Sequence, residues 1–197
     1  MNIDPKVVMQ LREMTGAGIV DAKNALEEAL GDLASAAELL RKKGVTKAAT
    51  RSERATAEGL VHAYIHANGK VGAMVELLCE TDFVARTEQF TRLAHDLAMQ
   101  VAAANPLYLK PEDVPPEVVA KEREIAAEEI AGAGKPPEIV EKIVTGKLEK
   151  FYSDACLLKQ TFIKDEDITV EELIGQVIAK TGENIQIRRF VRMTLGV

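Results

Sequence analysis

The sequence predicts an α+β protein, with an N-terminal module of three helices followed by a core in which a small antiparallel sheet packs with helices. Apolar residues recur at helical spacing in three short runs over residues 1–44, and glycines separate the runs. Further along, Asn68-Gly69 lies between two alternating runs, which is the strongest short signal for a hairpin. Alternation returns near the C-terminus over residues 184–195, which predicts another strand.

The composition limits the classes of protein that fit. With 197 residues and 47% hydrophobic residues, the chain is long enough for one or two domains with a real core. A net charge of -6 argues against general nucleic-acid binding, which usually needs a basic domain. The two cysteines give no disulfide framework and fit a reducing compartment. Without a signal peptide or an apolar run near about 18 residues, we expect a cytoplasmic protein that makes no membrane contact.

Residues 1–44 are expected to form the three-helix module. Thr15-Gly16-Ala17-Gly18 ends the first helix, and Gly31 ends the second. Asp32 can cap the third helix, which we expect to end at Gly44. The apolar residues assigned to the inner faces of these helices include Met14 and Ile19. A small unit of this kind resembles a ubiquitin-associated domain. Residues 45–58 are polar and alanine-rich, and we interpret them as a linker with helical tendency.

Residues 59–79 are expected to form the hairpin that opens the core, residues 59–197. A two-residue loop at Asn68-Gly69 would pair His66 with Val71 and His62 with Val75. In that register Cys79 lies about 13 Å from His62, which is too far for both to bind one zinc ion. We therefore predict no metal site, and the same spacing argues against Cys79 as a nucleophile activated by histidine.

The segment Cys79–Arg86 lies where the pattern changes from a strand to a helix. Thr81, Asp82, Phe83 and Val84 form the corner, with one acid and one aromatic ring side by side in the sequence. This corner suits a probe that enters a groove of another molecule. It also suits a simple helix start, in which Asp82 or Thr87 caps the helix and Phe83 packs into the core. Physical chemistry alone favours the helix start.

The rest of the core is expected to contain helices and the final strand. Helices are predicted at about Thr87–Ala104, at about Glu117–Ala131 and after Pro136-Pro137, and Thr169 with Glu172 predicts a capping box for another. Phe190 lies on the opposite face of the last strand, either as a docking surface or beneath one of the chain's own helices. No Walker loop or Rossmann fingerprint is present, so we expect no enzyme, catalytic residue or cofactor. The apolar residues expected on one buried face of the last strand are Ile185, Ile187, Val191, Met193 and Leu195.

The corner motif carries a resemblance to a known family. Thr-Asp-Phe-Val-Ala-Arg, preceded by an apolar strand ending in Cys-Glu, resembles the signature loop of elongation factor Ts. That family consists of guanine-nucleotide exchange factors for the translational GTPase elongation factor Tu (EF-Tu). The likeness covers essentially the whole chain, in the right order and spacing. Its other pieces are residues 11–13, 15–18, 21–26, 75–76, 134–136, 160–165 and 188–190.

The resemblance implies a division of labour along the chain. Arg12, Ile19 and Val20 would dock on the G domain of EF-Tu, although the family often has methionines at the last two positions. Residues 81–84 would enter the G domain near its magnesium and phosphate site, and the C-terminal core would hold a second domain. Such a factor acts by binding and needs no direct contact with nucleic acid.

The resemblance also implies a short form of the family. Longer members have a duplicated core and an inserted coiled coil, whereas here we expect one core and no coiled coil. We therefore expect a homodimer through the sheet, involving the Phe190 face, that supplies the second core surface. The alternative is a ubiquitin-associated-type adaptor that binds a partner through residues 1–44 without exchange activity.

Overall fold

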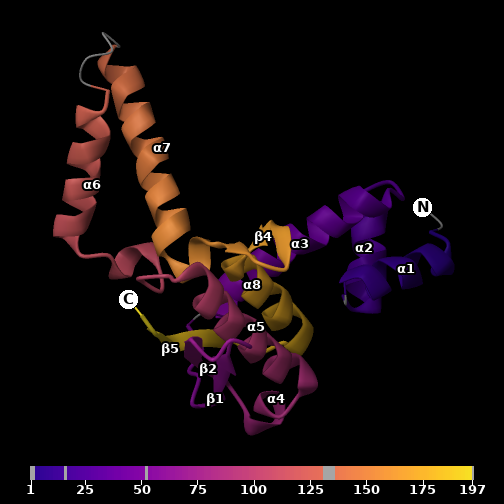
Figure 1. The fold of residues 1–197 in the computed structure, drawn as a ribbon. Coiled ribbons are helices and arrows are strands. Elements are labelled where there is room, and N and C mark those ends of the chain that lie inside the picture. Colours follow the sequence, from indigo (N-terminus) through magenta and orange to yellow (C-terminus); the bar gives the residue numbers. More distant parts are fainter. Residues whose placement is uncertain (1–2, 16, 52, 131–135, 197) are drawn as a thin grey trace. The chain divides into compact units, whose positions relative to one another are not determined.

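The structure is a computed structural model that describes residues 3–15, 17–51, 53–130 and 136–196, with the backbone alone for residues 44–50 (Figure 1). The chain divides into two compact units. The first contains residues 1–62, 76–95 and 172–188, and the second contains residues 63–75, 96–171 and 189–197. Helices and a small antiparallel sheet make up the chain, which confirms the predicted α+β class. The predicted domain boundaries stay predictions.

The first unit begins with the predicted three helices, α1 (Pro5–Thr15), α2 (Ile19–Glu28) and α3 (Leu33–Arg51). Gly31 adopts a φ of +89°, and its N–H bonds the Leu26 carbonyl at 2.8 Å, which ends α2 as a glycine cap does. Asp32 caps α3 as predicted, because its carboxylate accepts from the Ser35 N–H at 2.7 Å. The three helices enclose a small apolar core of their own, made of Val8, Leu11, Ala22, Ala25, Leu26 and Ala36.

Two expectations for this module are wrong. Helix α3 does not end at Gly44 but continues to Arg51, because one glycine costs only about 1 kcal/mol in a helix and the residues after it tolerate helix. Met14 and Ile19 do not reach the core, since their side chains are 62% and 58% exposed. Both lie next to the turn between α1 and α2, where the small core is already filled by Leu11 and Leu26.

The sheet has the strand order β1-β2-β5, with β1 (Glu58–Ile65), β2 (Val71–Cys79) and β5 (Ile185–Thr194). The His66 N–H bonds the Val71 carbonyl at 2.8 Å, which agrees with the predicted pairing of these residues. The expected two-residue loop is wrong, since the strands end at Ile65 and resume at Val71 and a turn closes between His66 and Gly69. Alternate residues of β2 are buried: Ala73, Val75, Leu77 and Cys79.

Strand β5 differs from its prediction in the second half. Ile185 and Ile187 are buried as expected, but Val191, Met193 and Leu195 are 50–74% exposed. The alternation changes at Arg188 and Arg189, which are both exposed, and Phe190 after them is half-buried. The predicted single buried face is therefore wrong beyond Arg189.

Two helices contribute buried side chains to the core of the first unit. Within the first unit, Phe90, Leu93 and Ala94 of α5 (Glu88–Ala104) are fully buried or nearly so, and so are Val177 and Ile178 of α8 (Val170–Thr181). Helix α5 matches its prediction closely. A short helix, α4 (Asp82–Ala85), lies between β2 and α5.

The second unit contains an antiparallel pair of helices, α6 (Pro116–Glu128) and α7 (Pro137–Ala155), which lie side by side in Figure 1. These two helices pack against each other, and the expectation that the chain has no coiled coil stays a prediction. Few apolar side chains are buried between the two helices, among them Ala126 on α6 and Val144 on α7. For this reason the sequence pattern of α6 indicates a charged helix and gives no sign that it pairs with α7. The expected α6 end at Ala131 lies outside the described residues.

Short elements complete the second unit. They are η1 (Pro111–Asp113), η2 (Leu157–Lys159), β3 (Thr161–Phe162) and β4 (Asp165–Thr169), with β3 and β4 antiparallel. The buried amide of Gln100 joins them to α5: its oxygen accepts from the Ile163 N–H at 2.9 Å, and its NH₂ group donates to the Thr161 carbonyl at 3.1 Å.

Candidate partner-binding site

The corner after β2 is a single turn of helix held at its N-terminus by Thr81. Thr81 has extended backbone angles, and its hydroxyl accepts from the Val84 N–H at 3.4 Å. Thr87 caps the following helix α5, since its hydroxyl accepts from the Phe90 N–H at 3.2 Å. The same hydroxyl donates to the Val84 carbonyl at 2.8 Å. The cap predicted at Thr87 is therefore present, and both ends of α4 are tied down.

Phe83 does not pack into the core. Its side chain is 80% exposed, the highest value among the exposed large apolar residues of the described chain. The neighbouring Asp82 carboxylate forms an ion pair with Arg86 at 2.9 Å along the same short helix. The helix-start interpretation is thus right about the cap and wrong about the ring, because capping holds the backbone in a position from which Phe83 points away from the core.

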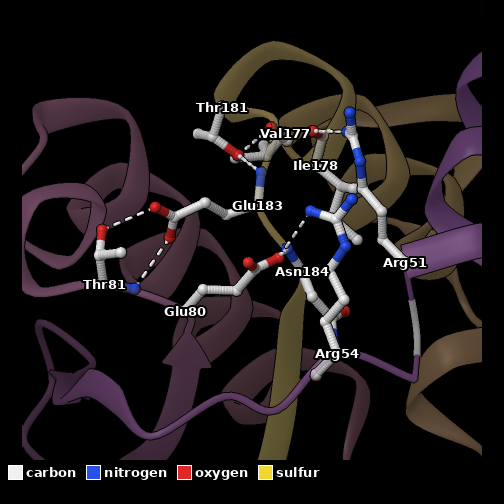
Figure 2. Close-up of polar contacts among 9 residues, drawn as sticks. All are labelled: Arg51, Arg54, Glu80, Thr81, Val177, Ile178, Thr181, Glu183 and Asn184. Atoms are coloured by element: carbon white, nitrogen blue, oxygen red, sulfur yellow. Dashed lines mark hydrogen bonds and ion pairs between the residues drawn. The ribbon is translucent and has the colours of Figure 1, made fainter.

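A polar network holds the corner at Glu80 and Thr81 (Figure 2). The Glu183 carboxylate accepts from both the backbone N–H and the hydroxyl of Thr81, at 3.0 and 2.6 Å. The Glu80 carboxylate accepts from the Asn184 N–H at 2.6 Å and pairs with Arg54 at 3.4 Å. Sequence reasoning missed Glu183 and Asn184. The one feature of the sequence that could have pointed to Glu183 and Asn184 is that they lie in a polar turn between a predicted helix and a predicted strand.

The cysteine next to the corner is chemically quiet. Cys79 is fully buried, and its thiol donates to the Thr81 carbonyl at 3.2 Å. Burial, assisted by the negative charges of Glu183 and Glu58, raises the pKa of this thiol to about 11. A thiol with this pKa is protonated at neutral pH and is a poor nucleophile.

The N-terminal candidates Arg12, Ile19 and Val20 lie around the turn between α1 and α2. The Arg12 guanidinium donates to the Ala17 carbonyl at 3.2 Å, which holds it beside the start of α2. Val20 is 69% exposed. Met9 and Met14 add further apolar surface on α1 at 48% and 62% exposure. Met9 was missed because exposure of an apolar side chain cannot be read from helical spacing alone.

The described residues hold no group of three histidine, cysteine or acidic side chains close enough together to bind a metal ion. Nor does any helix in that part of the chain combine the length and apolarity that crossing a membrane requires.

A family model described as elongation factor TS matches residues 17–196. Elongation factor Ts of Moorella thermoacetica is 57% identical over 189 residues, which cover 96% of this chain and 93% of that protein. Elongation factor Ts of Fervidobacterium nodosum is 53% identical over 196 residues, with both chains covered in full.

These matches first define a class, the elongation factors of protein synthesis. Within that class the chain belongs to the elongation factor Ts family, as its sequence motifs predicted. Thermotoga maritima elongation factor Ts is 55% identical over all of this chain and 98% of its own length.

Proposed function

We propose that this protein is a guanine-nucleotide exchange factor for EF-Tu, which promotes release of GDP so that GTP can bind. Family membership supports this role. The single structural observation that carries the mechanism is the 80% exposure of Phe83 on a helix tied at both ends. A ring held out in this way is ready to be buried by a partner, and burying a Phe side chain is worth about 1.5–3 kcal/mol.

The exchange works as a competition between two ligands of EF-Tu. Magnesium and the backbone amides of the phosphate loop hold the diphosphate by charge. Residues Thr81, Asp82, Phe83 and Val84 act as a wedge that displaces the segments ordering the magnesium shell. Because binding free energies are reciprocal, the factor and GDP weaken each other's binding by the same ratio. No bond is made or broken in this chain, so the factor acts by binding.

The N-terminal module supplies the first contact. Arg12, Ile19 and Val20 dock on the G domain, with Met9 and Met14 extending the apolar surface. This grouping is supported by the exposure of Ile19 and Val20 at the start of α2 and by the Arg12 hydrogen bond to Ala17 beside it. The C-terminal core holds a second domain of EF-Tu. The protein works in the cytoplasm, where translation takes place.

A short member of the family is expected to form a homodimer, in which a second copy of the chain supplies the second core surface. We propose that this second copy binds the outer face of the sheet. Ile65, Met74, Val191 and Met193 line a shallow hollow of about 320 Å³ on that face, all within the second unit. The face is mostly apolar, with Lys70 as the one charged residue lining the hollow, and such a face can pack on the same face of a second copy, which suits a two-fold dimer. This replaces the Phe190 face of the sequence-based prediction, because Phe190 is half-buried.

Release of a fluorescent GDP analogue from EF-Tu, followed by stopped flow, tests the exchange function and the wedge together. The unmodified protein should accelerate release strongly, and Phe83→Ala should lower the maximal rate about tenfold or more, as loss of about 1.5–3 kcal/mol requires. Leu107→Ala is the matched control, because Leu107 is also exposed, at 64%, and belongs to the other compact unit.

The outcomes separate the two claims. Equal acceleration by Phe83→Ala would keep the exchange function and reject the ring as its wedge. The exchange function would be rejected if the unmodified protein does not accelerate GDP release from an EF-Tu on which a related elongation factor Ts is active in the same assay. Binding to EF-Tu without acceleration would favour an adaptor that uses residues 1–44.

A further inference from the structure

The turn between α8 and β5, residues 181–184, holds the corner through one side chain that contacts Thr81 twice. Glu183 uses one carboxylate oxygen for the Thr81 N–H at 3.0 Å and the other for the Thr81 hydroxyl at 2.6 Å. The two residues are 102 positions apart in the chain. A two-point contact of this kind fixes orientation as well as distance, as bidentate recognition of a carboxylate generally does.

The contact with Glu183 also sets the direction in which the Thr81 hydroxyl donates and accepts hydrogen bonds. A threonine hydroxyl has one proton and two acceptor lone pairs. Because its proton goes to Glu183, a lone pair remains directed to the Val84 N–H, the cap of α4. Glu183 therefore orients the capping group of the helix that carries Asp82 and Phe83.

A second contact makes the attachment reciprocal. The residue before Thr81, Glu80, accepts from the N–H of the residue after Glu183, Asn184, at 2.6 Å. Asn184 is 1% exposed, and its side chain donates to the Arg54 carbonyl at 2.8 Å. Figure 2 shows the two carboxylates reaching in opposite directions between the same pair of segments.

The turn is itself rigid enough to present Glu183. Gly182 takes a φ of +79°, and its N–H bonds the Ile178 carbonyl at 2.9 Å, ending α8. The Thr181 hydroxyl donates to the Val177 carbonyl at 2.9 Å and accepts from the Glu183 N–H at 3.4 Å. Backbone and hydroxyl hydrogen bonds within the turn therefore hold the Glu183 backbone in place, independently of the contacts that its carboxylate makes with Thr81.

We propose that Glu183 is a positioning residue for nucleotide exchange, which holds Thr81 so that α4 presents Asp82 and Phe83 in one orientation before EF-Tu binds. This inference rests on the proposed function. Without Glu183 the corner samples more conformations, and part of the binding free energy is spent on ordering it instead of displacing the magnesium shell. The first docking through the N-terminal module does not depend on this contact.

The test is a graded series, Glu183→Gln and Glu183→Ala, in the full-length protein. Glutamine keeps one acceptor oxygen and loses the other, whereas alanine loses both. Glu76→Gln is the control, because Glu76 is another acid of the same unit, and it accepts a hydrogen bond from Arg188 at 2.9 Å. The maximal rate of GDP release should fall about tenfold for Glu183→Ala and less for Glu183→Gln, as expected for loss of charged hydrogen bonds.

A second pair of readouts separates positioning from simple loss of structure. The half-saturating concentration of the factor should stay within about twofold, because docking is unchanged. Amide hydrogen exchange of the free protein should become faster at residues 81–84 in both variants, and far-UV circular dichroism should be unchanged. Glu76→Gln should leave the maximal rate and the exchange of residues 81–84 unchanged.

Unchanged maximal rates in both Glu183 variants would overturn the inference even if the unmodified protein is a strong exchange factor. If the unmodified protein does not accelerate release, the proposed function fails. Hydrogen exchange then decides whether Glu183 holds the corner, and unchanged protection of residues 81–84 would overturn that too. If Glu183→Ala unfolds, the rate and protection of Glu183→Gln decide in the same way.

Discussion

The imidazole of His62 on β1 contacts that of His95 on α5, with Nε2 of one 3.2 Å from Nδ1 of the other. The rings meet edge to face, with their centroids 5.3 Å apart. One ring nitrogen can donate to the other only while at least one ring is neutral. Burial, assisted by the nearby His95, lowers the pKa of His62 from its usual value.

This pair predicts that stability falls in mild acid. The unfolded chain protonates His62 as pH falls through about 6.5, whereas the folded chain resists until the pH reaches its lower pKa. The contribution of His62 is therefore fully present above about pH 6.5 and is lost as pH falls toward the folded value. Thermal unfolding midpoints at pH 7.5 and 5.5 should differ less in His62→Gln than in the unmodified protein.

Two glycines should respond to alanine in opposite directions. A Cβ at Gly59, where φ is +153°, would lie 2.1 Å from the Leu77 carbonyl oxygen. Gly59→Ala should therefore lower stability by more than about 1 kcal/mol. Gly146, within α7, has no atom within 4 Å of its would-be Cβ, and Gly146→Ala should add about 1 kcal/mol. Calorimetry of both variants measures the effect, and a stable Gly59→Ala protein would contradict the close approach of β1 and β2.

Removal of the buried Gln100 amide should destabilise the second unit. Gln100→Leu fills a similar volume but leaves the Ile163 N–H and the Thr161 carbonyl without this partner. Each buried polar group left unsatisfied costs about 1–3 kcal/mol, so we expect a loss of at least about 2 kcal/mol. Thermal unfolding measures it, and Gln10→Leu, at an exposed position on α1, is the control. Equal midpoints for the two variants would argue that Gln100 contributes little.

The dimer proposal predicts that the molecular mass in solution is that of two chains, and that only substitutions on the proposed interface lower it. Light scattering on the unmodified protein should give about twice the 21.5 kDa of one chain. Met193→Asp should give a monomer, since it places a charge on an apolar face where Met193 is 74% exposed. Leu107→Asp changes a residue of similar exposure elsewhere and should remain dimeric. A monomeric unmodified protein at working concentration would reject the dimer.

Local patterns predicted the elements that depend on neighbours in sequence. The cap at Asp32, the cap at Thr87 and the register of His66 with Val71 all follow from short-range backbone bonding, and the structure confirms them. Exposure was harder to predict. Ile19 and Phe83 are apolar residues at helix starts, and only the volume already filled by other side chains decides whether they reach a core.

The sequence by itself determined the α+β class, the three-helix module and the family, because periodicity, turn residues and motif order are properties of the linear chain. Only the tertiary structure decided that Phe83 stays outside and that Glu183 meets Thr81. It also decided that α6 and α7 form one hairpin. Contacts between residues far apart in sequence leave no periodic trace, since each depends on where two backbone segments are held by the packing of everything between them.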